Sequence, residues 1–267
     1  MLDLGFNDIT IRSCSMLDLN FHDIIVMYFG GPIGTGKTTS AHIAQELLCN
    51  VLESEVAGCK ILSFAEAVRK EASEHYGFDI ELTRTQEGKK TPLKPCDGLP
   101  LCDGPQGDYP ATVRDALQKW GQYRRENNGS LYWVHRVVQS IYEEHVDYGT
   151  NVFIIDDVRY GNEALFLKNI GAVLHSPAFT FDDGRQFQKA YVCGVKYTGV
   201  APAPCDGLST DPLNDRFGVT NASKHISEWA ISSPMFDSMF DLVCQPEYGN
   251  LPSYVALAVD KLISKYA

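Results

Sequence analysis

The segment that most constrains the fold of this chain is the loop Gly31–Thr38, with the sequence GPIGTGKT. It conforms to the pattern G-x-x-x-x-G-K-[ST], follows the apolar run Ile24–Phe29 and precedes a stretch of helical character, Thr39–Cys49. Glycines let the backbone curl so that successive N–H groups point at one anion, and the N-terminus of the following helix adds a favourable dipole. This context of strand, loop and helix predicts a phosphate-binding loop.

The lysine and the hydroxyl residues of the loop have separate expected roles. Lys37 should neutralise the negative charge of the phosphates, and Thr38 should hold a Mg²⁺ ion that does the same. The residues expected to bind the nucleotide are Gly31, Gly34, Thr35, Gly36, Lys37, Thr38 and Thr39. The motif alone does not choose between ATPases, GTPases and small-molecule kinases.

Composition narrows the class of ligand. The chain has 267 residues, 44% of them hydrophobic, and a formal net charge of −11. It is long enough for a large α/β domain, and its charge argues against broad binding of nucleic acid or of an anionic membrane. No stretch has the apolar length of a membrane span, the N-terminus lacks the layout of a secretion signal, and the cysteines form no C-x-x-C pair. We therefore expect a cytoplasmic protein with a small anionic substrate.

Strand-like and helix-like segments alternate along most of the chain. We expect strands at 24–29, 59–64, 151–156, 172–175 and 240–243, and helices at 39–49, 65–76, 112–125, 131–146, 162–169 and 253–266. The alternation predicts an α/β fold, a three-layer sandwich of the P-loop NTPase type with a mostly parallel central sheet. Ligands of such folds bind at the carboxyl ends of the strands.

Three segments fall outside this alternation. Residues 1–22 are expected to be an N-terminal extension of a P-loop domain that spans 23–267, and a near-repeat runs across this boundary, MLDLGFNDI at 1–9 against MLDLNFHDI at 16–24. Residues of about 78–111 and 177–223 are rich in Pro, Gly and charge, so we expect irregular insertions there. The second of these is the better candidate for a lid.

The charged run Asp156–Arg159 closes the expected strand 151–156. There a carboxylate could hold Mg²⁺ or a substrate hydroxyl, and Arg159 could make a forked contact with a phosphate. The alternative is a helix-capping acid followed by a surface arginine. The nearby phosphate loop favours the functional interpretation.

A third group lies on the expected helix 112–125. Four residues lie on or beside this helix: Arg114, Gln118, Arg124 and Arg125. Arg114 and Gln118 are four residues apart and share a helix face. An arginine and an amide suit a nucleoside monophosphate, because the first can bind the phosphate and the second can read a base edge. A solvated helix face is the alternative. Cations on separate segments match phosphoryl transfer, which needs positioning and positive charge.

In this order, the segments resemble the deoxynucleoside monophosphate kinases of tailed phages, which belong to the nucleoside monophosphate kinase fold. The resemblance covers roughly residues 24–243. Its closest match is Asp157–Glu163, which is similar to the family's Asp-x-Arg-x-x-x-Glu segment, with Glu163 in a structural role. The segments that carry it are the phosphate loop, Phe64–Gly77, Arg84–Leu93, Val113–Val134, Asp157–Glu163 and His225–Glu228.

The resemblance implies transfer of the γ-phosphate of ATP to a deoxynucleoside monophosphate, with Mg²⁺, for DNA precursor synthesis. It implies a host-cell cytoplasmic location if the protein is phage-encoded, no membrane or stable nucleic-acid partner, and, by analogy alone, a homodimer. The implied catalytic residues are Lys37, Arg114, Asp157 and Arg159, and the implied metal ligands are Thr38 and Asp157. The implied substrate contacts are Arg69, Lys90, Arg114, Gln118, Arg124, Asp157 and Arg159.

Two other functions stay open. One is a phage kinase that phosphorylates hydroxymethylated pyrimidines within DNA, which should need a basic track that a chain of charge −11 does not offer at the level of sequence. The other is a nucleotide-binding module without turnover.

Overall fold

The computed structural model describes residues 20, 22–32, 34–52, 58–94, 109–198, 234–245 and 250–266, apart from the side chains of residues 235 and 266. The chain forms two compact units. We call residues 1–62 and 141–267 the sheet unit, and residues 63–140 the helical unit. Most of the N-terminal extension, the centre of the first expected insertion and most of the second insertion lie outside the described residues.

The sheet unit is built on five strands in the order β2-β3-β1-β4-β5, and all of their pairings are parallel. The strands are β1 (Ile24–Gly30), β2 (Cys59–Leu62), β3 (Val152–Val158), β4 (Ala190–Tyr197) and β5 (Leu242–Cys244). Every residue of β1 is buried. Such an uninterrupted apolar run is typical of a parallel strand that helices cover on both faces.

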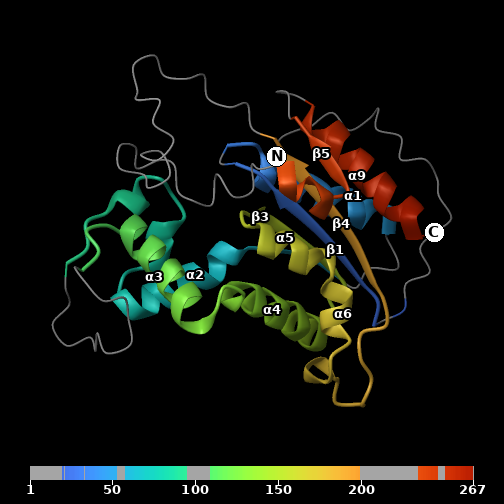
Figure 1. Cartoon of the computed structure of the whole chain (residues 1–267), viewed down its shortest axis with the longest axis horizontal. Coiled ribbons are helices and arrows are strands. Elements are labelled where there is room, and N and C mark those ends of the chain that lie inside the picture. The colour runs from blue at the N-terminus through green and yellow to red at the C-terminus, as the bar shows by residue number, and fades with distance from the viewer. Residues whose placement is uncertain are drawn as a thin grey trace. The chain divides into compact units, whose positions relative to one another are not determined.

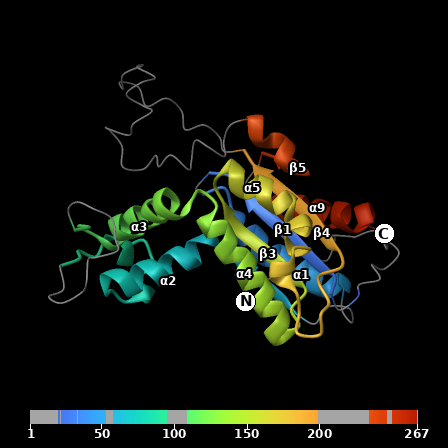
Figure 2. The ribbon, with the colours of Figure 1, turned by 60° about the horizontal axis from the view of Figure 1, so that its bottom comes forward.

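Helices lie on both faces of this sheet (Figures 1 and 2). On one face, α1 (Lys37–Leu52) and α9 (Leu251–Tyr266) share a buried apolar core with β1, β3 and β4. On the other face lie α5 (Gly161–Lys168) and α6 (Ile170–Leu174), which contact β4. The predicted three-layer α/β fold of the P-loop NTPase type, with a mostly parallel sheet, is confirmed.

Register brings the carboxyl ends of the three central strands together. Gly30, the last residue of β1, pairs with Val158 of β3 on one side and with Lys196 of β4 on the other. The loop that follows Gly30 therefore begins between the ends of β3 and β4. This is the edge at which parallel α/β sheets bind their ligands.

The sequence analysis was wrong about one strand. The expected strand at 172–175 belongs to α6, where Ile170 and Leu174, four residues apart, are both fully buried on one helix face. The missing strand is β4, which lies inside the range 177–223 where an irregular insertion was expected. Gly194 weakens the strand signal of β4, yet it is required because an added Cβ would lie 2.3 Å from the Tyr28 ring.

The helical unit contains α2 (Phe64–Tyr76), α3 (Val113–Asn128) and the first part of α4 (Tyr132–Tyr148). Two 3₁₀ turns, Ile80–Thr83 and Gly88–Lys90, occupy part of the first expected insertion. The start of each of the first two helices is capped locally. Ser63 caps α2, and Thr112 forms a reciprocal capping box with Asp115 at the start of α3.

Within the described part of the chain, no helix has the length and apolar character needed to cross a membrane.

Candidate phosphate-binding site

The loop between β1 and α1 has the backbone shape that its glycines allow. Gly31, Gly34 and Gly36 have φ angles of +142°, +80° and +84°, which L side chains rarely adopt. An added Cβ on Gly31 would lie 2.6 Å from the carbonyl oxygen of Tyr197, and one on Gly36 would lie 2.6 Å from a methyl group of Leu251. The loop is therefore closely packed between the end of β4 and the start of α9. Ile33, at its centre, lies outside the described residues.

Lys37 folds back over this loop. Its Nζ donates hydrogen bonds to the carbonyl oxygens of Gly31, at 2.7 Å, and of Pro32, at 2.5 Å, and the residue is only 8% exposed. The hydroxyl of Thr35 donates to the same Pro32 carbonyl at 2.9 Å. A buried ammonium needs such acceptors. Phosphate oxygens would replace neutral carbonyls by charged acceptors, which form stronger hydrogen bonds.

Thr38 meets an aspartate of the neighbouring strand. Its Oγ1 donates to Oδ2 of Asp156, at the end of β3, over 2.9 Å. Hydroxyl and carboxylate oxygens are ligands that Mg²⁺ accepts, and their separation is close to the edge of an octahedron with 2.1 Å bonds, about 3.0 Å. The residues at this position therefore fit a magnesium ion.

This geometry corrects the choice of Asp157 as the metal ligand, which the resemblance implied. The register of β3 against β1 shifts between Ile155 and Val158, so strand alternation does not choose between the two acids. The hydrogen bond from Thr38 identifies Asp156 as the acid beside the loop. Because the residues of β3 before the two acids are all apolar, the sequence alone does not show which acid takes this place.

The turn after β3 is fixed by a buried glutamate. Oε2 of Glu163 accepts hydrogen bonds from the backbone N–H groups of Arg159, at 2.9 Å, and Tyr160, at 3.0 Å, and Glu163 is 2% exposed. Glu163 thus holds the start of α5 and sets the backbone position of Arg159 at the carboxyl edge of the sheet. Its contacts are structural, as the sequence suggested.

The other expected substrate residues lie in the helical unit. Arg69 and Arg84 both pair with Glu66, at 3.0 Å and 3.3 Å. Nη2 of Arg114, in the first turn of α3, donates to Oε1 of Gln86 over 2.7 Å. Arg84 was absent from the expected substrate contacts. No local sequence pattern could have identified Arg84, because only its shared contact with the Glu66 carboxylate relates it to Arg69.

Two more of these residues are exposed on the same unit. Lys90 is exposed and its Nζ pairs with the Glu87 carboxylate at 3.0 Å, and Gln118 is exposed on α3. Exposed pairs of this kind contribute little to stability. Neither side chain is needed for the packing described here, so both stay predictions as substrate contacts.

Arg124 has a different environment from the other arginines. Its Nε donates to Oε2 of Glu71 over 3.0 Å, and its guanidinium lies 4.6 Å from the Trp120 ring centroid and 5.2 Å from that of Tyr132. Glu71 also accepts hydrogen bonds from Trp120 and Tyr132, at 3.2 and 2.8 Å, and forms an ion pair with Arg136 at 3.3 Å. One carboxylate thus joins α2, α3 and α4. The structure places Arg124 within this packing, and we do not retain it as a substrate contact.

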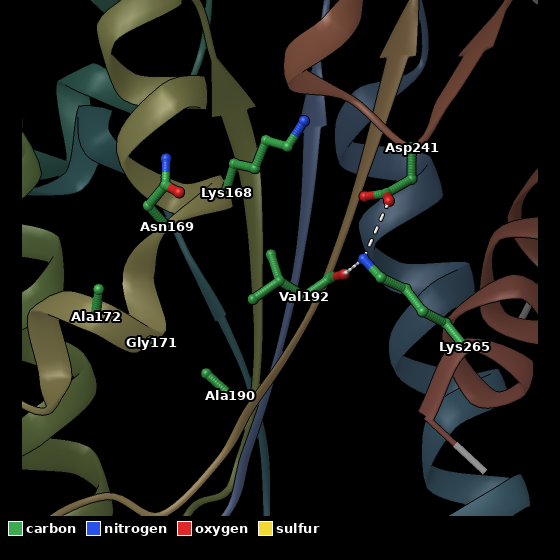
Figure 3. A pocket seen from close by; sticks show the side chains of 8 residues that line it. All are labelled: Lys168, Asn169, Gly171, Ala172, Ala190, Val192, Asp241 and Lys265. Atoms are coloured by element: carbon green, nitrogen blue, oxygen red, sulfur yellow. Dashed lines mark hydrogen bonds and ion pairs between the residues drawn. The ribbon is translucent and has the colours of Figure 1, made fainter.

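A separate pocket of about 260 Å³ lies in the sheet unit (Figure 3). The Lys265 ammonium lies 3.3 Å from both the Val192 carbonyl and the Asp241 carboxylate. The pocket borders the first half of β4, away from the carboxyl edge, and includes no residue of the phosphate loop. Its lining residues are Lys168, Asn169, Gly171, Ala172, Ala190, Val192, Asp241 and Lys265.

Comparisons with known proteins carry no argument on the fold or the function of this chain. No family model and no curated protein matches the chain. A solved structure that matches comes from work titled "Molecular and structural characterization of the PezAT chromosomal toxin-antitoxin system of the human pathogen Streptococcus pneumoniae". It shares 13% identity over 91% of this chain and 86% of that chain, with a TM-score of 0.35. So low a score carries no argument, and the chain's assignment as an α/β protein of the P-loop type rests on its own sheet order and loop.

Proposed function

We propose that this protein transfers the γ-phosphate of ATP to a deoxynucleoside monophosphate, with Mg²⁺, to form ADP and the deoxynucleoside diphosphate. The observation that carries the proposal is the arrangement of Lys37, Thr38 and Asp156 around the glycine loop. Three functions of a phosphate site meet there: backbone N–H donors, a buried cation and a pair of oxygen ligands for a metal. A role in the supply of DNA precursors in the cytoplasm is part of the proposal.

The sheet unit supplies the donor site in this proposal. The ammonium of Lys37 would exchange the carbonyls of Gly31 and Pro32 for oxygens of the triphosphate, and the start of α1 would face the same phosphates. Thr38 and Asp156 would hold Mg²⁺. When bound, the ion neutralises charge on the phosphates.

The helical unit supplies the acceptor site. The Glu66 carboxylate binds Arg69 and Arg84, and the amide oxygen of Gln86 binds Arg114. An acceptor phosphate offers oxygen acceptors to the same guanidinium groups, with more negative charge. If the acceptor phosphate displaced the Glu66 carboxylate, both Arg69 and Arg84 would bind the phosphate instead. The acceptor phosphate is an anion at neutral pH, so the reaction needs no general base. Arg159 remains the proposed contact from the sheet unit.

The two alternative functions differ from this one in what they require. A kinase acting on modified bases in DNA should bind a polymer of phosphates, and the net charge of −11 opposes this. A binding module without turnover would retain the loop but not transfer phosphate. Both are separable from the proposal by their products.

The test is a screen of all common and modified deoxynucleoside monophosphates with MgATP, in which ADP and the diphosphate are measured, beside modified duplex DNA. We expect both products with at least one free monophosphate, and loss of most activity in Lys37→Ala. Product on DNA alone would favour the first alternative, and nucleotide binding without any product the second.

A pair of variants on α3 tests the acceptor site. Arg114→Ala should raise KM for the monophosphate by roughly 10- to 100-fold, the size of a lost charge-assisted hydrogen bond, with KM for ATP unchanged. Arg125→Ala, the same change further along the helix, is the matched control and should alter neither KM. Equal effects of the two variants would remove Arg114 from the acceptor site.

A further inference from the structure

One tyrosine of β4 contacts the helix that follows the phosphate loop. The hydroxyl of Tyr197, the last residue of β4, lies 2.7 Å from Oγ of Ser40 in the first turns of α1. Both residues are fully buried. A hydrogen bond between two buried hydroxyl groups fixes the distance between the strand and the helix, because breaking it would leave polar groups without a partner.

The backbone of the same tyrosine contacts the beginning of the loop. An added Cβ on Gly31 would lie 2.6 Å from the Tyr197 carbonyl oxygen and 3.1 Å from its Cβ. Gly31 therefore lies directly against Tyr197. The residue thus contacts the loop at its first glycine, and the helix three residues after Lys37.

Tyr197 is itself held firmly by the sheet. Its neighbour Lys196 pairs with Gly30 of β1, and the N–H of Thr198 donates to the carbonyl of Cys244 in β5 over 2.8 Å. The ring lies nearly parallel to that of Phe29, with centroids 6.2 Å apart. Burial raises the pKa of Tyr197 to about 12, so its hydroxyl remains protonated at neutral pH. The residue is a rigid support for the two ends of the loop.

We infer that Tyr197 is a positioning residue of the phosphate loop, which holds Gly31 and Ser40 at the spacing that nucleotide binding requires. The inference rests on the proposed function only in that the loop binds a nucleotide. Without the bond between the two hydroxyl groups, the helix and the loop gain freedom, and the fraction of molecules with a binding-ready loop falls. Apparent affinity falls by the same fraction.

Removal of the hydroxyl alone tests this inference. In Tyr197→Phe, the dissociation constant for MgADP, measured by calorimetric titration, should rise about two- to fivefold, the size of one neutral hydrogen bond. Ser40→Ala removes the other partner and should weaken binding similarly. In the double variant the two effects should not add, because both changes remove the same bond.

Tyr142→Phe is the matched control. Tyr142 also belongs to the sheet unit, and its hydroxyl donates over 2.9 Å to the carbonyl of Thr180, a residue outside the loop and α1. We expect its loss to lower the thermal stability of the nucleotide-free protein as in Tyr197→Phe, with unchanged affinity for MgADP. A purely structural role of Tyr197 would give the two variants the same affinity.

The outcomes separate this inference from the proposed function. Wild-type affinity in Tyr197→Phe, or equal weakening in Tyr142→Phe, would overturn the inference. If Tyr197→Phe does not fold, Ser40→Ala decides in the same way. Normal nucleotide binding without phosphoryl transfer would overturn the proposed function and leave the inference standing, whereas a wild-type protein that binds no nucleotide would overturn both.

Discussion

The packing of the loop against β4 predicts an unequal response of two neighbouring glycines to the same substitution. In Gly31→Ala, the new side chain meets two penalties. The φ angle of +142° is nearly restricted to glycine, which costs about 1–3 kcal/mol. The added Cβ would also lie 2.6 Å from the Tyr197 carbonyl oxygen, about 0.7 Å inside a normal C···O contact of ~3.3 Å.

No movement of a flexible side chain can relieve this overlap. The oxygen belongs to the backbone of β4, which is paired with β1 and β5, so the loop itself must shift. Overpacking of this kind costs about 1–3 kcal/mol, which brings the expected total for Gly31→Ala to about 2–6 kcal/mol. In Gly34→Ala the φ angle is +80°, and no atom of the residues that the structure describes lies within 4 Å of the added Cβ. Backbone strain of about 1–2 kcal/mol is then the whole cost.

Urea denaturation followed by circular dichroism measures both variants, and the transition that MgADP shifts identifies the unfolding of the sheet unit. We expect Gly31→Ala to lower the free energy of unfolding by at least about 1 kcal/mol more than Gly34→Ala. Equal losses in the two variants would refute the close packing of the loop on Tyr197.

Three further predictions concern a half-buried carboxylate, a metal ligand and two histidines. Glu71→Ala should destabilise the helical unit by about 1–3 kcal/mol, because Trp120, Tyr132 and two arginines lose their shared acceptor, and tryptophan fluorescence during urea denaturation measures it. Asp156→Asn should reduce the gain in ADP affinity that Mg²⁺ provides by about tenfold, and Asp157→Asn should not, as calorimetric titration with and without Mg²⁺ would show. Burial lowers the pKa of His22 and His145. The unfolded chain therefore takes up protons below about pH 6.5 that the folded chain does not, so the stability of the sheet unit should fall on acidification, in urea denaturation from about pH 7.5 to about 5.5.

Each of these predictions has a contrary result. A loss below about 1 kcal/mol in Glu71→Ala would mean that its partners are satisfied by water. If Mg²⁺ increased the ADP affinity of the two aspartate variants equally, Asp156 would not be a ligand of the metal. Stability that is constant or rises on acidification would contradict the burial of the histidines, and His145→Gln is the control that should flatten the dependence on pH.

Local sequence signals predicted the loop and the strand that leads into it. The apolar run of β1 and the glycine spacing of the loop are short-range patterns, and the structure places both as expected. The strand β4 was missed because Gly194 and Lys196 interrupt its pattern. Both are explained by partners distant in sequence, since Gly194 makes room for the Tyr28 ring and Lys196 pairs with Asp237 at 2.6 Å.

The site could be predicted from the sequence only in part, again because partners distant in sequence place some of its residues. Lys37 and Thr38 follow from the motif alone, whereas the choice between Asp156 and Asp157 depends on the contact with Thr38, which is distant in sequence. Arg124 has the charge expected of a phosphate contact, but Glu71, on another helix, determines its position. Sequence patterns indicate which residues can carry the chemistry, and long-range partners decide which of them take part in the packing instead.

The central claim is that the glycine loop and Lys37 bind the phosphates of a nucleotide. A calorimetric titration of wild-type protein and of Lys37→Ala with MgADP tests it most directly. The wild type should bind one nucleotide per chain, and Lys37→Ala should bind at least about tenfold more weakly, since it loses a charge-assisted contact. Equal affinity in the two proteins, or no binding by the wild type, would contradict the claim.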